Sequence, residues 1–200
     1  VNVYGFINHS RYLPDRRDLN RFFPGTETGS LASRLARIFM DEVADKCTHG
    51  IDLHTGSQHR TNLPQIRAGL DDPETRRLAE AFGAPVIIDA NLRDGSLRQA
   101  VKEKGIPMLL YEAGEVLRFD ELAVRTGIRG ILAVMRAIGM LPGDITTGRK
   151  PEPIIARSTT WVRASKSGIL RTRMLPGNPV AQSEPMGIIA DPFGENEEMV

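Results

Sequence analysis

The sequence contains one cysteine, no marked excess of either charge and no long apolar run, and each shortage excludes a class of protein. Cys47 alone cannot form an internal disulfide, which favours a reducing compartment, and we expect the cytoplasm. With 26 basic and 25 acidic residues, the chain lacks the basic excess of most nucleic-acid-binding domains. No run approaches the roughly 18 apolar residues of a membrane span. We therefore expect neither a nucleic acid nor a membrane as a partner.

The N-terminal residues lack a basic segment followed by an apolar one, so no secretory signal is expected. The chain begins at Val1 rather than at Met, in residues that resemble the end of a strand. We therefore expect it to be a piece of a longer protein. Its 200 residues are sufficient for one core with a small additional module.

Helical and strand-like patterns alternate along the first two thirds of the chain. Ser30 is a candidate N-cap for a helix. Its apolar face is expected to carry Leu31, Leu35, Ile38, Phe39 and Val43. Further helices are expected over residues 74–83, 96–105 and 120–140, and strands over residues 50–54, 85–90 and 106–114. This alternation predicts a layered α/β domain with a mainly parallel sheet.

The composition changes after Leu141, which divides the chain into two expected domains. Residues 142–154 are rich in proline, glycine and threonine and are predicted to be a linker. Residues 155–200 contain short β-type runs separated by glycine and proline turns. We therefore expect an α/β domain over residues 1–141 and a small all-β module over residues 155–200.

His54 ends a strand-like run in the segment GIDLHTG, residues 50–56, directly before a glycine turn. Ligands gather at the carboxyl ends of strands in parallel sheets. A catalytic zinc site needs about three protein ligands and a water, yet no other histidine forms an i, i+4 pair with His54 on a helix. The residues alone therefore supply one candidate metal ligand, and a structural histidine is the alternative.

The segment RYLPDRRDLNRFFPG, residues 11–25, contains four arginines and has neither helical nor strand periodicity. Its prolines indicate an ordered loop. Asp18 and Asn20 lie among the arginines, an arrangement that suits bidentate recognition of a carboxylate. Asp18 would then orient a neighbouring arginine. A solvated basic loop is the alternative interpretation.

Glu112 follows an apolar run in the segment LLYEAGE, residues 109–115. A carboxylate in that position would be partly removed from water, which suits a general base. A strand-end salt bridge with Arg98 or Arg118 is the alternative. Glu115 lies further into the turn and is expected to face solvent.

The motifs N…RYLP, DLNR-x-FPG, DLHTG and EAG occur in an order and spacing that resemble the succinylglutamate desuccinylase/aspartoacylase family. The likeness extends from Val1 to about Leu141. It implies a three-layer domain of the zinc carboxypeptidase type. The tail resembles the small C-terminal β domain of the same family, which is similar to the barrel-sandwich fold of lipoyl and biotinyl modules. Its turn LPGN lacks the lysine of a carrier domain, so lipoylation or biotinylation is not expected.

By position in these motifs, the resemblance implies that His54 is a zinc ligand and Glu112 the general base that activates the zinc-bound water. It implies that Arg11 polarises the scissile carbonyl and stabilises the oxyanion. The family's other two zinc ligands come from a G-x-H-G-x-E motif, which this chain lacks. We expect that motif upstream of Val1, and we expect the isolated chain to bind Zn²⁺ weakly and to catalyse little.

The resemblance also implies a substrate site. Asn20 and Arg21 would hold a substrate carboxylate with Asp18 as support, and Arg98 in GSLRQA matches another arginine of the pocket. The implied function is zinc-dependent hydrolysis of the amide bond of a small, carboxylate-bearing N-acyl compound such as an N-acyl amino acid. The alternatives are a zinc carboxypeptidase that acts on peptides and a non-catalytic anion-binding domain. The sequence leaves the oligomeric state open, with a homo-oligomer among the alternatives.

Overall fold

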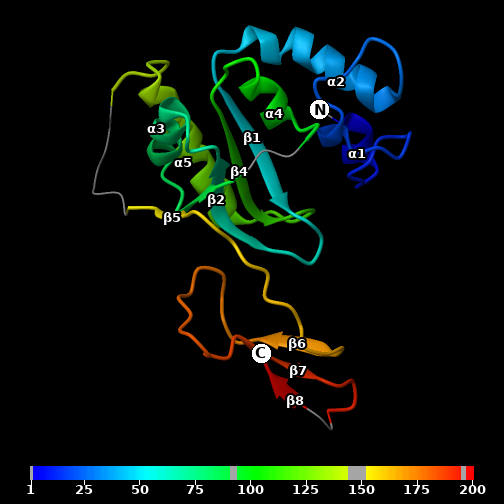
Figure 1. The fold of residues 1–200 in the computed structure, drawn as a ribbon, viewed down its shortest axis with the longest axis vertical. Helices are drawn as coiled ribbons and strands as arrows, with labels where there is room; N and C mark the ends of the chain where they lie inside the picture. The colour runs from blue at the N-terminus through cyan, green and yellow to red at the C-terminus, as the bar shows by residue number, and fades with distance from the viewer. Residues whose placement is uncertain (1, 91–93, 144–151, 195–196) are drawn as a thin grey trace. The chain divides into compact units, whose positions relative to one another are not determined.

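The structure is a computed structural model that describes residues 2–90, 94–143, 152–194 and 197–200 (Figure 1). The chain divides into two compact units, Val1–Arg157 and Ser158–Val200. Most of the predicted linker lies outside the described residues. Its last residue, Ile154, opens strand β5 (Ile154–Ala156), which pairs with the sheet of the first unit. The second unit therefore starts after Arg157, three residues later than the module predicted from residue 155.

A five-stranded sheet forms the centre of the first unit, in the order β1–β4–β2–β3–β5. The other four strands are β1 (Gly50–Gly56), β2 (Asn62–Ala68), β3 (Val86–Asp89) and β4 (Met108–Glu115). Three of the four neighbouring pairs are parallel, and only β2 and β4 run antiparallel. The predicted mainly parallel sheet is confirmed, whereas β2 was not predicted from the sequence.

Helices cover both faces of this sheet and complete the predicted three layers. Helices α3 (Pro73–Phe82) and α5 (Glu121–Ala137) pack on one face, and α2 (Leu31–Glu42) and α4 (Leu97–Lys102) lie on the other (Figure 1). Ser30 caps α2 as predicted, because its side chain accepts a hydrogen bond from the Ser33 N–H. Gly83 ends α3 in the left-handed conformation with φ 76°.

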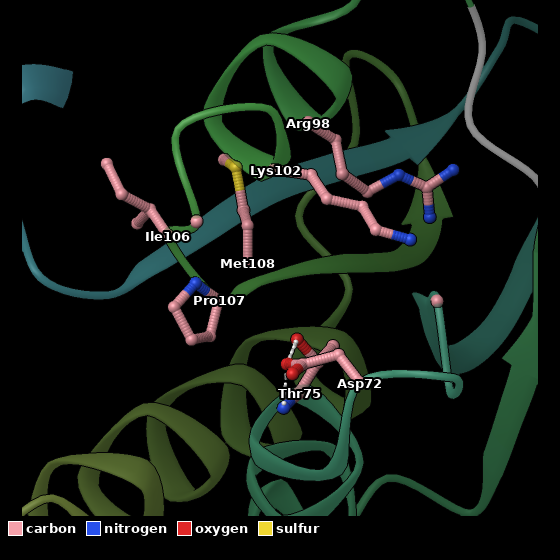
Figure 2. Close-up of a pocket in the computed structure, with 9 residues that line it drawn as sticks. Asp72, Thr75, Arg98, Lys102, Ile106, Pro107 and Met108 are labelled. Atoms are coloured by element: carbon pink, nitrogen blue, oxygen red, sulfur yellow. Dashed lines mark hydrogen bonds between the residues drawn. The ribbon is translucent and has the colours of Figure 1, made fainter.

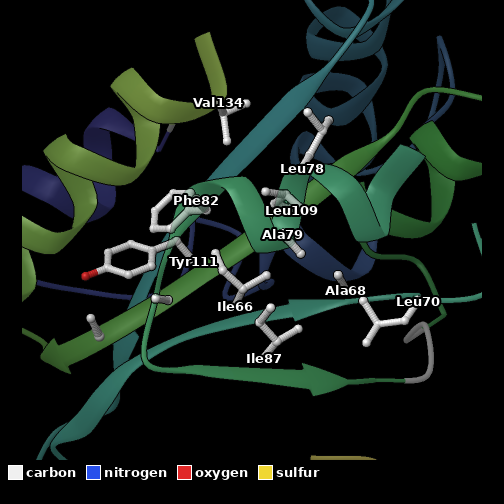
Figure 3. Close-up of a cluster of buried hydrophobic side chains, with 12 residues drawn as sticks. Ile66, Ala68, Leu70, Leu78, Ala79, Phe82, Ile87, Leu109, Tyr111 and Val134 are labelled. Carbon is white, nitrogen blue, oxygen red and sulfur yellow. The ribbon is translucent and has the colours of Figure 1, made fainter. Parts of the chain in front are cut away.

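The main core lies between the sheet and the α3–α5 pair (Figure 3). Its largest buried side chains include Ile66, Leu78, Phe82, Ile87, Leu109 and Tyr111. The rings of Phe82 and Tyr111 contact each other with centroids 5.0 Å apart. A Cβ on Gly130 of α5 would lie 2.2 Å from the Phe82 ring. Glycine at that position therefore allows α5 to pack directly against α3.

The buried face of α2 differs from the predicted one. Its buried residues are Ala32, Ala36 and Met40. The prediction is wrong for Leu31, Ile38 and Val43, which are exposed. The reason is the close approach of the preceding loop, since a Cβ on Gly25 would lie 2.3 Å from the Ser33 carbonyl oxygen. Such an approach favours small side chains on the contacting face of the helix.

Residues 3–7 form a short helix, α1 (Val3–Ile7), so the strand end predicted for the N-terminal residues is wrong there, and Val1 lies outside the described residues. The side chain of Asn2 accepts a hydrogen bond from the Gly5 N–H at 2.8 Å, which caps this helix. No helix in the described part of the chain is long and apolar enough to cross a membrane.

The second unit contains a three-stranded antiparallel sheet in the order β6–β7–β8. Its strands are β6 (Ile169–Thr172), β7 (Gly187–Ala190) and β8 (Glu197–Met199). The described residues of this unit form no helix, which confirms the predicted small all-β module.

Candidate active site

His54 and Glu112 lie side by side on the parallel strands β1 and β4, where they are register partners. Register partners project from the same face of a sheet. Both positions are near the carboxyl ends of their strands, as predicted. The His54 side chain is 34% exposed and that of Glu112 is 23% exposed. Both are therefore supported by the sheet and accessible to a small molecule.

Asp52 orients the His54 ring. The two residues project from the same face of β1, and His54 Nε2 lies 2.9 Å from Asp52 Oδ2. This hydrogen bond raises the pKa of His54 above its ordinary value, and the charge of Glu112 acts in the same direction. Burial and the charge of Arg11 oppose the shift.

Two glycines explain why the motifs HTG and EAG have their particular endings. A Cβ on Gly56 would lie 1.9 Å from the Arg60 carbonyl oxygen, so a side chain there would displace the turn after β1. Gly114 has φ 62°, which favours glycine. It belongs to a bulge, because β4 has one more residue than β1 between the pairs His54–Glu112 and Gly56–Glu115.

The carboxylate of Glu112 contacts two residues of β2 that the sequence analysis did not identify. Asn62 Nδ2 donates a hydrogen bond to Glu112 Oε1 at 2.9 Å. Arg67 Nε lies 4.0 Å from Glu112 Oε2. The alternative interpretation of Glu112 was a salt bridge with Arg98 or Arg118, but the arginine near its carboxylate is Arg67, and Arg118 pairs with Glu115. Recognising β2 as a strand antiparallel to β4 would have placed both residues beside Glu112.

Glu115 does not face solvent as predicted, since its side chain is 14% exposed. Its Oε1 accepts a hydrogen bond from the His59 N–H at 2.8 Å, and its Oε2 lies 3.4 Å from Thr61 Oγ1. The bond from His59 lowers the pKa of Glu115, an effect that burial opposes and the charge of Arg118 assists. Through these contacts Glu115 holds the turn between β1 and β2 against the end of β4.

Asp18 lies between two of the loop arginines. Its Oδ2 accepts hydrogen bonds from Arg11 Nε at 3.0 Å and Nη2 at 2.7 Å, and Arg21 Nη2 lies 4.0 Å from the same oxygen. Arg21 also donates to the Asn20 carbonyl. The Asn20 side chain accepts from the Leu97 N–H at 2.9 Å, which ties the loop to α4. The ordered loop is confirmed, although the Arg11 side chain remains 58% exposed.

Arg98 is buried in a different place. With Thr75, Lys102 and others it lines a cavity of about 160 Å³ that includes Met108, at the N-terminal end of β4 (Figure 2). Glu112 lies further along the same strand and does not line this cavity. His54 also borders a largely apolar groove of about 310 Å³ on the α5 side of the sheet, the face to which Tyr111 and Ala113 project and from which the Glu112 side chain points away. His54 and Glu112 are register partners, and the charge of Arg11 acts on His54, so this arginine lies near the pair, whereas Arg98 lines the other cavity.

The described residues do not form a complete metal site. No group of three or more His, Cys, Asp or Glu side chains within them is arranged to hold a metal ion. His54 with Asp52 has the histidine–carboxylate arrangement that orients a metal-ligating ring. One oriented histidine is fewer than the three protein ligands of a catalytic zinc site.

This chain is similar to known deacylases. It is 26% identical over 186 residues to the N-alpha-acetyl-L-2,4-diaminobutyric acid deacetylase of Halomonas elongata, which covers 88% of this chain and 54% of that protein. It is also similar to the crystal structure of a succinylglutamate desuccinylase/aspartoacylase from Rhodobacter sphaeroides, with a TM-score of 0.83 and 26% identity over 100% of this chain and 63% of that one.

The fold also matches the product-bound ectoine utilization protein EutE (DoeB) of Ruegeria pomeroyi, with a TM-score of 0.84, 21% identity and coverage of 100% of this chain and 63% of that one. The chain therefore spans between half and two thirds of the length of these relatives. The sequence profile of the succinylglutamate desuccinylase/aspartoacylase catalytic domain matches residues 1–138. On this match, the chain belongs to the succinylglutamate desuccinylase/aspartoacylase family.

Proposed function

We propose that the full-length protein is a zinc-dependent hydrolase that cleaves the amide bond of a small N-acyl amino acid. The observation that carries the proposal is the register pairing of His54 with Glu112 in the region of the arginine loop. The name of the Halomonas relative, a deacetylase of an N-acetylated amino acid, supports the same reaction class. The single cysteine fits the cytoplasm as its compartment.

Glu112 is the general base in this proposal. Its carboxylate takes a proton from the attacking water and then delivers it to the nitrogen of the leaving amine. The sheet supports the residue from both sides, through His54 on β1 and Asn62 on β2. This support keeps the carboxylate in place while the proton moves.

Arg11 and Arg21 supply positive charge for the substrate. Arg11 stabilises the negative charge that develops on the carbonyl oxygen. Arg21 and Asn20 bind the substrate carboxylate, and Asp18 holds both guanidinium groups near each other. Asp18 neutralises part of the charge of these two arginines. A bound anion would therefore compete with Asp18 for their guanidinium groups.

His54 would supply one ligand to Zn²⁺, and further ligands from outside this chain would complete the site. When bound, the metal would polarise the substrate carbonyl and lower the pKa of its water. Elemental analysis of the purified full-length protein tests this part of the proposal. We expect stoichiometric zinc in the parent protein and a loss of it in His54→Ala. A zinc-free protein that is fully active would refute the metal assignment.

A substrate screen with the full-length protein tests the reaction. We expect hydrolysis of N-acetyl and N-succinyl amino acids, and a fall in kcat of about 10²–10⁴-fold in Glu112→Gln with zinc retained. Glu80→Gln, on the exposed side of α3, is the matched control and should leave kcat unchanged. Normal turnover in Glu112→Gln would refute the role of Glu112. Faster cleavage of peptides with a free C-terminus than of N-acyl amino acids would favour a carboxypeptidase instead.

A further inference from the structure

Asn62 reaches Glu112 because strand β2 contains a bulge. Gln65 pairs with Glu112, but Asn62 pairs with Gly114, so two residues of β2 lie opposite one residue of β4. Without the extra residue, Asn62 would pair one position further along β4 and would project from the opposite face. Pro64 lies within the bulge, where its missing N–H removes no regular ladder hydrogen bond. The bulge therefore turns the Asn62 side chain towards Glu112.

The contact occupies one oxygen of the carboxylate. Asn62 Nδ2 lies 2.9 Å from Glu112 Oε1. An ionised carboxylate only accepts hydrogen bonds, so the amide must present its nitrogen. On the other side, the 4.0 Å between Arg67 Nε and Glu112 Oε2 is longer than a hydrogen bond. Oε1 therefore accepts a hydrogen bond, whereas Oε2 lies near the positive charge of Arg67 and accepts no hydrogen bond from the residues that the structure describes.

The turn before Asn62 is fixed independently of Glu112. Glu115 binds the His59 N–H and lies within reach of Thr61, the residue that directly precedes Asn62. The turn also passes over Gly56, where the Arg60 carbonyl is in close contact with the strand. Asn62 thus projects from a segment that is attached to both β1 and β4, which suits a residue that must hold another side chain still.

We propose that Asn62 is a positioning residue for Glu112, and that its hydrogen bond to Oε1 directs proton transfer to Oε2. The inference rests on the proposed role of Glu112 as general base and adds the atom that accepts the proton. Asn62 does not itself touch the substrate in this arrangement. Its loss therefore affects the chemical step and leaves substrate binding intact.

Steady-state kinetics of the full-length enzyme test the inference. We expect Asn62→Leu to lower kcat about 10–100-fold, because the carboxylate loses its fixed orientation, while KM stays nearly unchanged. Asn8→Leu is the matched control, since it also removes a side-chain amide, one that donates to the Tyr4 carbonyl at 2.9 Å. A rise in KM with constant kcat would overturn the inference, because Asn62 would then bind substrate.

A double-mutant cycle separates positioning from a general structural effect. In the Glu112→Gln background, Asn62→Leu should cause little further loss of kcat, because the residue it positions is already disabled. An equal loss in both backgrounds would overturn the inference while leaving the proposed function intact. Full activity of Glu112→Gln alone would instead refute the proposed function, and the inference with it.

Discussion

Gly56→Ala should destabilise the first unit through a clash between two pieces of backbone. The new Cβ would lie 1.9 Å from the Arg60 carbonyl oxygen and 2.9 Å from that of Gly114. An ordinary carbon–oxygen contact is about 3.3–3.6 Å, so the Arg60 carbonyl must move away from the new Cβ by roughly 1.4 Å or more. Overpacking of this kind costs about 1–3 kcal/mol. The gain of about 0.4–1 kcal/mol from a less flexible unfolded chain offsets only part of it.

Gly50→Ala, at the other end of β1, is the matched control. Its Cβ would meet the Met108 side chain, 3.3 Å away at Cγ, and a methionine side chain can move at little cost. We expect its stability to stay within about 0.5 kcal/mol of the parent chain. The comparison isolates the backbone clash from the general effect of replacing a strand glycine.

Urea unfolding of the 200-residue chain followed by circular dichroism at 222 nm measures the effect on the first unit, since the described α-helices all lie there. With about 1–3 kcal/mol per molar urea as the slope, the midpoint of Gly56→Ala should fall by about 0.5–1 M. Fluorescence of Trp161, the single tryptophan, reports the second unit and should not change. Equal midpoints for Gly56→Ala and Gly50→Ala would refute the reasoning.

Three further predictions concern the same unit. Gly130→Ala should destabilise the chain despite a better helix propensity, worth about 1 kcal/mol, because its Cβ would overlap the Phe82 ring; a higher unfolding midpoint would contradict this. Leu109→Ala, at a fully buried position, should cost about 2–5 kcal/mol in urea unfolding. Without metal, the raised pKa of His54 adds stability that is complete below its ordinary value of 6.5 and is lost as pH rises through the folded-state value. Asp52→Asn should therefore flatten the pH dependence of unfolding above pH 6.5, and an unchanged profile would exclude the pair as its source.

Much of the fold could be predicted from local patterns. The caps at Ser30 and Gly83 and the apolar runs that became β1, β3 and β4 are local signals, and the structure has these elements where they were expected. The buried face of α2 could not be predicted in this way. A helix with apolar residues on more than one side has several faces that could be buried. The loop at Gly25 approaches α2 closely, and the face that is buried is the one with the small side chains of Ala32 and Ala36.

The residues of the candidate site likewise fall into those that local sequence patterns identify and those that only strand pairing brings together. His54 and Glu112 were identified because each lies just before a glycine at the end of an apolar run, and Asp18 because it lies among the arginines of a loop that contains prolines. Asn62 and Arg67 carry no such signal. They reach Glu112 only through the antiparallel pairing of β2 with β4, and a strand containing a proline gives a weak local pattern.

The bulge in β2 is one reason why the contact between Asn62 and Glu112 could not be predicted from the sequence. A single extra residue decides on which face of the sheet Asn62 lies, and neither composition nor periodicity records which partner residue it will oppose. The partner strand is irregular at the same level, where Gly114 takes φ 62° and β4 gains a residue relative to β1. Glu112 therefore sits between two bulges, one on each neighbouring pairing. Such irregularities interrupt the sheet's hydrogen bonding, and bulges are often found next to active sites, so their coincidence at Glu112 supports the proposed role of this residue.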